Sequence, residues 1–217
     1  MKIIAIFIFA VCFNLFSQDF QTKDDNKKFL IIETEGHTSS ISKIEITPDN
    51  KDIITVSYDK TIRIWDLETG LLKRTFRGYM SDGARGMHYY MSLSPDGKMI
   101  ATGGWLYGDY DGDPMIGAIR IYDYNSGKIV KVLTGLTNVV NALSYSPDGK
   151  YLAAGSGNGN VIIWNTKDYK EYFNNTLHSN PCYGIAFSPD SKMLATVSTD
   201  LSGILTHMVS PCHNLTS

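Results

Sequence analysis

The stretch from Gly36 to Asp66 constrains the fold most, because three strand-like runs lie there between sharp turn signals. Residues 41–46, 53–56 and 61–65 alternate in polarity or are rich in β-branched side chains, as expected of strands. Thr47-Pro48-Asp49-Asn50 and Ser57-Tyr58-Asp59-Lys60 separate the runs with residues that favour tight turns. The pattern predicts an antiparallel meander that starts after Gly36-His37 and ends at Trp65-Asp66.

The same unit recurs along the chain at a fixed spacing. Trp65 follows Pro48 by 17 positions, and Trp164 follows Pro147 by 17 positions. Between these two units Pro95 and Tyr122 are 27 positions apart, so an insertion of 10 residues is expected within 105–117. Insertions in repeats map to loops.

A fourth unit starts at His178 and carries the turn Ser188-Pro189-Asp190-Ser191. An aromatic residue is due at position 206, where the chain has Thr206. Residues 201–217 show neither strand alternation nor an aromatic-acidic pair, and we expect them to form a divergent tail.

The paired Gly-His and Trp-Asp signals, with Pro-Asp turns at constant spacing, resemble the WD-repeat family, in which each repeat forms one blade of a β-propeller. The resemblance implies an all-β fold of about three complete four-stranded blades plus a partial fourth, an incomplete propeller of the secreted type and apparently truncated. It covers residues 29–200, divided into 29–35 (outer strand of a closing blade), 36–78, 79–135 with the insertion 105–117, 136–177, and the partial blade 178–200.

The first 17 residues resemble a secretory signal peptide. Lys2 precedes an apolar run over residues 3–13, which is too short to span a bilayer as a helix. We expect a disordered lead-in over 18–28, a secreted or periplasmic location, and no stable membrane span after signal removal. Cys182 and Cys212 would then remain; they could pair in an oxidising compartment or stay as thiols.

The resemblance also implies a buried hydrogen-bonded set in the first repeat, formed by His37, Ser57, Asp59 and Trp65. His178, Ser198 and Asp200 occupy the matching positions of the fourth repeat. An Asp, a His and a Ser invite a catalytic-triad interpretation, but their spacing belongs to the repeat framework and a nucleophile must be accessible. We therefore expect these residues to be structural. The third repeat has Leu136 and Asn158 at the His and Asp positions, and the second has Ala84 at the His position. Both repeats should depend on packing alone.

The insertion is the feature that does not repeat. Asp109, Asp111 and Asp113 alternate in it and superficially suggest a calcium loop, but an EF-hand would need Gly and Glu where the chain has Pro114 and Arg120. A solvated acidic loop is the favoured interpretation. Its aromatic residues are candidates for contact with a partner: Trp105, Tyr107 and Tyr110.

For function, the resemblance implies a non-catalytic scaffold that binds other proteins through its blade loops, without a cofactor. A net charge of −2 gives no electrostatic case for nucleic acid. Propellers close with 4 to 8 blades, and fewer blades would leave open sheet edges that favour self-association. The alternatives are the propeller portion of a larger secreted enzyme and a truncated gene product.

Overall fold

Four antiparallel sheets make up the described protein, and every regular element is a strand. The computed structural model describes residues 36–77, 85–106 and 116–207. The first sheet contains β1 (Ile41–Ile46), β2 (Asp52–Ser57), β3 (Thr61–Asp66) and β4 (Leu72–Arg77). The second contains β5 (Met87–Leu93), β6 (Met99–Trp105), β7 (Ile119–Asp123) and β8 (Ile129–Leu133).

The third sheet contains β9 (Val140–Tyr145), β10 (Tyr151–Ser156), β11 (Asn160–Asn165) and β12 (Glu171–Thr176). The fourth contains β13 (Cys182–Phe187), β14 (Met193–Ser198) and β15 (Gly203–His207). In each sheet the strands follow one another in chain order, as in a simple meander.

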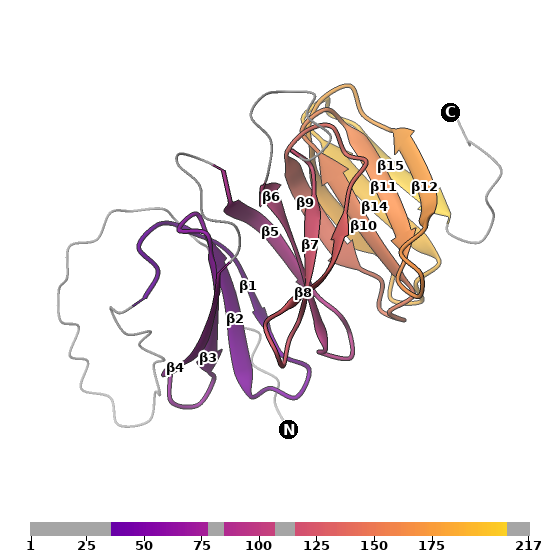
Figure 1. Ribbon diagram of the computed structural model, residues 1–217. Helices are drawn as coiled ribbons and strands as arrows, with labels where there is room; N and C mark the ends of the chain where they lie inside the picture. Colours follow the sequence, from indigo (N-terminus) through magenta and orange to yellow (C-terminus); the bar gives the residue numbers. More distant parts are fainter. Residues whose placement is uncertain (1–35, 78–84, 107–115, 208–217) are drawn as a thin grey trace, which may run out of the picture.

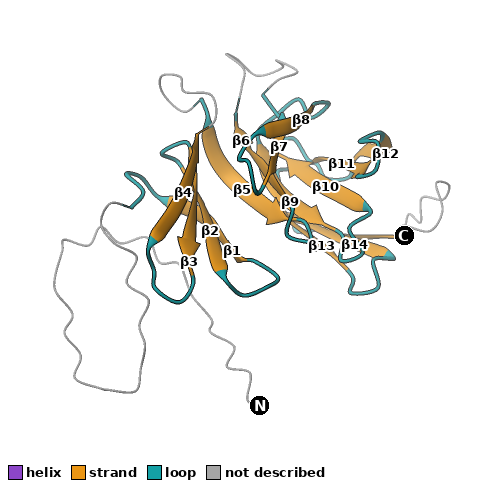
Figure 2. Cartoon of the chain, turned by 60° about the horizontal axis from the view of Figure 1, so that its bottom comes forward, coloured by secondary structure: helices purple, strands orange, loops and turns teal. Residues whose placement is uncertain are grey.

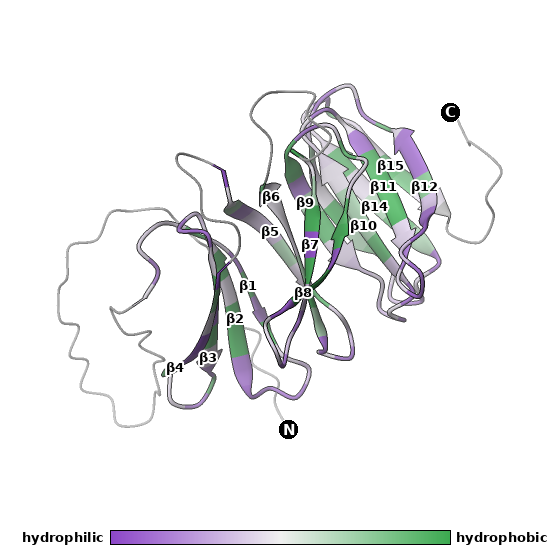
Figure 3. Ribbon diagram, in the orientation of Figure 1, coloured by the Kyte–Doolittle hydropathy of each residue, from purple (hydrophilic) through white to green (hydrophobic). Residues whose placement is uncertain are grey.

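The sheets stand side by side in an open row, with β1–β4 at one end and β13–β15 at the other (Figure 1). A second view shows the same arrangement (Figure 2). The first strands of neighbouring sheets lie against each other, β1 beside β5, β5 beside β9 and β9 beside β13. Three apolar clusters fill the spaces between successive sheets, and hydrophobic residues concentrate along the strands while the connecting turns are hydrophilic (Figure 3).

The turn between the first two strands is built alike in all four sheets. In the second sheet Ser94 Oγ donates to Asp96 Oδ1 at 2.6 Å and accepts from the Met99 amide at 2.9 Å. A left-handed residue then completes the turn, with φ of 72° at Gly97. The corresponding residues in the other sheets also have positive φ: Asn50, Gly149 and Ser191. The Pro-Asp turns predicted from the sequence thus determine where the first two strands of each sheet are joined.

The expected all-β fold is confirmed: the strand-like run 41–46 coincides with β1, and the runs 53–56 and 61–65 lie within β2 and β3. The interpretation of 201–217 as lacking a strand is wrong, because β15 pairs along β14. Thr206 lies opposite Leu194, as Trp65 lies opposite Ile53, so the spacing of 17 holds without the aromatic residue. Main-chain pairing to the open edge of β14 orders the strand.

No helix among the residues that the structure describes is long and apolar enough to cross a membrane. The predicted signal peptide, the lead-in and the outer strand at 29–35 lie outside the described residues, as do 208–217.

Candidate functional site

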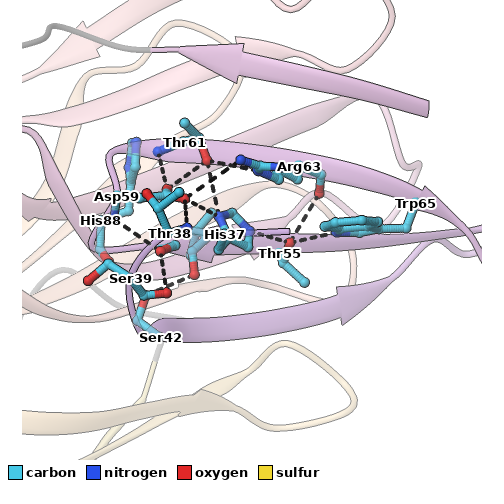
Figure 4. Close-up of polar contacts among 12 residues, drawn as sticks. His37, Thr38, Ser39, Ser42, Thr55, Asp59, Thr61, Arg63, Trp65 and His88 are labelled. Carbon is cyan, nitrogen blue, oxygen red and sulfur yellow. Dashed lines mark hydrogen bonds and ion pairs between the residues drawn. The ribbon is translucent and has the colours of Figure 1, made fainter. Parts of the chain in front are cut away.

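A chain of buried hydrogen bonds links the segment before β1 to the second and third strands of the first sheet (Figure 4). His37 Nδ1 lies 2.8 Å from Asp59 Oδ2, and His37 Nε2 lies 2.7 Å from Thr55 Oγ1. Trp65 Nε1 donates to the same Thr55 hydroxyl at 2.8 Å. Asp59 also accepts from the Thr61 hydroxyl at 2.6 Å and from the Thr38 amide at 3.0 Å.

These contacts determine the direction of the hydrogen bonds. An ionised carboxylate only accepts, so the proton on His37 sits on Nδ1 and is donated to Asp59. Nε2 is then an acceptor and receives the Thr55 hydroxyl proton, which leaves the Thr55 oxygen to accept from the indole of Trp65. Both side chains between Trp65 and Asp59, Thr55 and His37, are thereby satisfied.

Ser57 does not belong to this chain, and its predicted role is wrong. The Ser57 hydroxyl instead donates to the Ser39 carbonyl at 3.2 Å and accepts from the Asp59 amide at 3.0 Å. Thr55 and Ser57 are two residues apart on β2 and therefore share a face. The alternation identifies this face correctly, but the histidine ring reaches Thr55, the position nearer the centre of the strand.

In the fourth sheet, too, the histidine contacts the hydroxyl two positions before the predicted one. His178 Nε2 lies 2.9 Å from Thr196 Oγ1, and its Nδ1 lies 2.9 Å from Ser202 Oγ. Ser202 in turn donates to Asp200 Oδ1 at 2.5 Å. Ser198 is again outside the set, because it donates to the Asn180 carbonyl at 3.0 Å. His178 and Asp200 are thus brought together as predicted, 3.5 Å apart at their nearest atoms.

Two hydroxyl positions in each set were missed by the sequence reasoning. They are Thr55 and Thr61 in the first sheet, and Thr196 and Ser202 in the fourth. The signal that could have found them is the identical spacing of these Thr and Ser residues from the two Pro-Asp turns.

The third sheet retains part of the arrangement. Leu136 is fully buried where a histidine would stand, in the apolar cluster between the second and third sheets. Asn158 nevertheless accepts from the Ser156 hydroxyl and donates to Thr137 Oγ1 at 3.0 Å. This sheet therefore does not depend on packing alone.

The electrostatics of the first set favour a neutral imidazole beside an ionised carboxylate. Burial lowers the pKa of His37, and this effect outweighs the hydrogen bond and charge of Asp59, which act in the opposite direction. Burial alone would raise the pKa of Asp59, but hydrogen bonds from Thr61, His37 and Thr38 lower it overall. The side chains of His37 and Asp59 are 1% and 5% exposed, so the set satisfies polar groups inside the protein and presents none to a substrate.

A second buried histidine lies where β5 meets the first sheet. His88 is fully buried, and burial lowers its pKa to about 3, with the charge of Arg120 adding to the effect. Neither ring nitrogen forms a well-aligned hydrogen bond within the described residues, and the weak attraction of the Lys60 carbonyl does not offset burial. His88 is therefore neutral at physiological pH.

The candidate partner-binding residues of the insertion are placed only in part. The prediction that Trp105 lies in the inserted loop is wrong. Trp105 is the last residue of β6 and pairs with Met87 of β5. The strand continues through Gly103 and Gly104 into Trp105 because the pairing with β5 extends that far. The other candidates, Tyr107 and Tyr110, lie outside the described residues.

The candidate calcium ligands Asp109, Asp111 and Asp113 also lie outside the described residues. Elsewhere in the described ranges, no three His, Cys, Asp or Glu side chains gather closely enough to hold a metal ion. Cys182 is buried at the start of β13, and burial raises the pKa of its thiol. Its predicted partner Cys212 is not described, so their disulfide stays a prediction.

A hollow of about 350 Å³ lies between the second and third sheets, near the Pro-Asp turns. Asp96 and Asp148 line it, but Lys98 and Lys150 accompany these carboxylates at 3.5 and 3.3 Å. The hollow therefore offers little uncompensated charge to a ligand.

Comparison with known proteins gives one family and related full-length proteins. The sequence profile described as "WD domain, G-beta repeat" matches residues 28–66, 127–165 and 172–202. The "Small ribosomal subunit protein RACK1" of Caenorhabditis elegans is 30% identical over 181 residues, which cover 78% of this chain and 50% of that protein. The "WD repeat-containing protein SL1-17" of Schistosoma mansoni is 28% identical over 170 residues, which cover 78% of this chain and 51% of that protein. The chain spans about half the length of these relatives.

Proposed function

Because the chain belongs to the WD-repeat family, we propose that it is a non-catalytic scaffold that binds other proteins through the loops of its sheets. The observation that carries the proposal is that the acid–base residues of the first sheet are buried and hydrogen-bonded to each other. His37 and Asp59 are turned toward each other and almost wholly buried. The side chains that could serve catalysis instead fix the segment before β1 to β2 and β3 of the first sheet, which leaves the loops and outer faces as the binding surface.

The partner class that fits best is protein. A net charge of −2 gives no reason to expect phosphate contacts. The name of the nematode relative assigns that protein to the small ribosomal subunit. The apolar run over residues 3–13 instead favours export of this chain, so we propose that it acts in a secreted or periplasmic location.

The part of the surface that we assign to partner binding is the insertion after β6. It joins β6 to β7 and carries Tyr107 and Tyr110, with Trp105 at its base. Tyr and Trp are enriched among the residues that dominate protein interfaces. Acidic neighbours in the same loop would favour a partner with a basic patch.

The test begins with capture of partners on the immobilised protein and measurement of the affinity of each captured protein. Tyr107→Ala together with Tyr110→Ala is expected to weaken binding about tenfold or more, because each substitution removes a large aromatic side chain of the kind that dominates protein interfaces. Trp105 should be changed only to Phe, since its Nε1 is buried and Ala would disturb β6. The control is Leu71→Ala, which removes an apolar side chain that is 57% exposed just before β4.

Two results would count against the proposal. Unchanged affinity in the loop variant would remove the insertion from the binding surface. Turnover of a peptide, ester or glycoside by the pure protein would contradict a non-catalytic role.

A further inference from the structure

The first strand of the first sheet exposes a row of isoleucines at positions that are buried in the following sheets. Ile41, Ile44 and Ile46 on β1 are 47%, 44% and 51% exposed. By strand register their counterparts are His88, Met91 and Leu93 on β5, and Val140, Leu143 and Tyr145 on β9. Those six residues are at most 9% exposed. The difference arises because a preceding sheet covers β5 and β9, whereas none among the described residues covers β1.

The fourth sheet also has an exposed apolar face, at the other end of the row of sheets. Val197 on β14 and Leu205 on β15 are 51% and 59% exposed. Their register counterparts in the first sheet are Val56 and Ile64, which are fully buried because the second sheet packs on them. No described residue follows the fourth sheet to cover Val197 and Leu205 in that way.

The two exposed faces are complementary by construction. Each interface inside the chain joins one face of each kind, as where Val56 and Ile64 pack with Met91 and Leu93. The exposed face of β13–β15 corresponds to the face that carries Val56 and Ile64 in the first sheet. The exposed face of β1 corresponds to the face that carries Met91 and Leu93 in the second sheet. They are therefore the two halves of a fourth interface of the type that the chain already makes three times.

We propose that a second copy of this chain supplies the missing half at both ends. The β13–β15 face of one copy packs on the β1 face of its partner, and the partner returns the same contact. Four sheets from each copy then close a ring of eight, which is within the range of known propellers.

Paired charge substitutions test the proposal on the full chain, with sedimentation velocity and native mass spectrometry as readouts. The wild-type protein is expected to have twice the mass of one chain. Ile44→Glu with Ile46→Glu, or Val197→Lys with Leu205→Lys, should each weaken dimerisation about tenfold or more, because either pair places charges against an apolar face. Ile129→Glu with Val130→Lys is the control, since both residues are exposed on β8, away from these faces.

Mixing the two variants is the decisive step. A mixed dimer has one wild-type interface and one interface that pairs Glu with Lys, so dimers should return when the variants are combined. Circular dichroism verifies that each variant keeps its strands. A wild-type monomer at all concentrations, open polymers, loss of dimer in only one variant, or failure of the mixture to recover would each overturn the two-copy ring.

Discussion

Removal of the Thr55 hydroxyl is the sharpest perturbation of the buried set. Thr55→Val keeps the shape of the side chain and its preference for a strand. It leaves two polar groups without partners, His37 Nε2 at 2.7 Å and Trp65 Nε1 at 2.8 Å. Each buried group that loses its partner costs about 1–3 kcal/mol, so the variant should lose about 2–6 kcal/mol of unfolding free energy.

The fourth sheet supplies a matched control. Thr196 contacts His178 as Thr55 contacts His37, but Thr206 replaces the tryptophan. Thr196→Val therefore leaves one polar group unpaired instead of two and should cost about half as much, about 1–3 kcal/mol. Ser57→Ala, which affects two contacts to main-chain atoms at 3.0 and 3.2 Å, should cost about 1 kcal/mol.

Urea unfolding followed by circular dichroism measures these differences as shifts in midpoint at constant slope. A double-mutant cycle isolates the tryptophan contact, because Trp65→Phe should cost about 1 kcal/mol less in the Thr55→Val protein than in the wild type. Equal costs for Thr55→Val and Ser57→Ala, or strict additivity with Trp65→Phe, would refute the assignment of Thr55 as the shared partner.

Two further predictions concern the interfaces between sheets. His88→Leu should flatten the loss of stability below pH 6.5, because the folded-state pKa of about 3 makes protonation favour unfolding by about 5 kcal/mol across that range; a pH series of urea midpoints measures this, and an unchanged acid limb would contradict it. Gly155→Ala should destabilise by about 1–3 kcal/mol, because its Cβ would lie 2.5 Å from Cys182 Sγ. Cys182→Ala should recover part of that loss in melting temperature, and full additivity would argue against the clash.

The fold was predictable from sequence because the turns that separate its strands are specified by local residues. Each Pro-Asp turn determines its own hairpin through contacts that span five residues, such as Ser94 to Met99. β15 was missed because its order comes from pairing with β14, a contact that leaves no aromatic signal in residues 203–207.

The candidate site was predictable only in outline. His37 and Asp59 could be paired by spacing, but which hydroxyl of β2 meets the ring depends on how the segment before β1 crosses the sheet. Thr55 and Ser57 share a face, and alternation alone cannot separate them. His88 was missed for a related reason: its burial depends on the packing of β5 against the first sheet, which is a long-range contact.

The protonation state of His37 tests most directly the claim that the buried set is structural. Selective ¹⁵N labelling of the five histidines, with His37→Gln to assign the signal, reports the tautomer and its titration by NMR. The structure predicts a proton on Nδ1, none on Nε2, and a pKa of His37 lowered below its usual value of about 6.5, because burial disfavours the charged ring. A proton on Nε2, or titration near pH 6.5 as in an exposed imidazole, would contradict it.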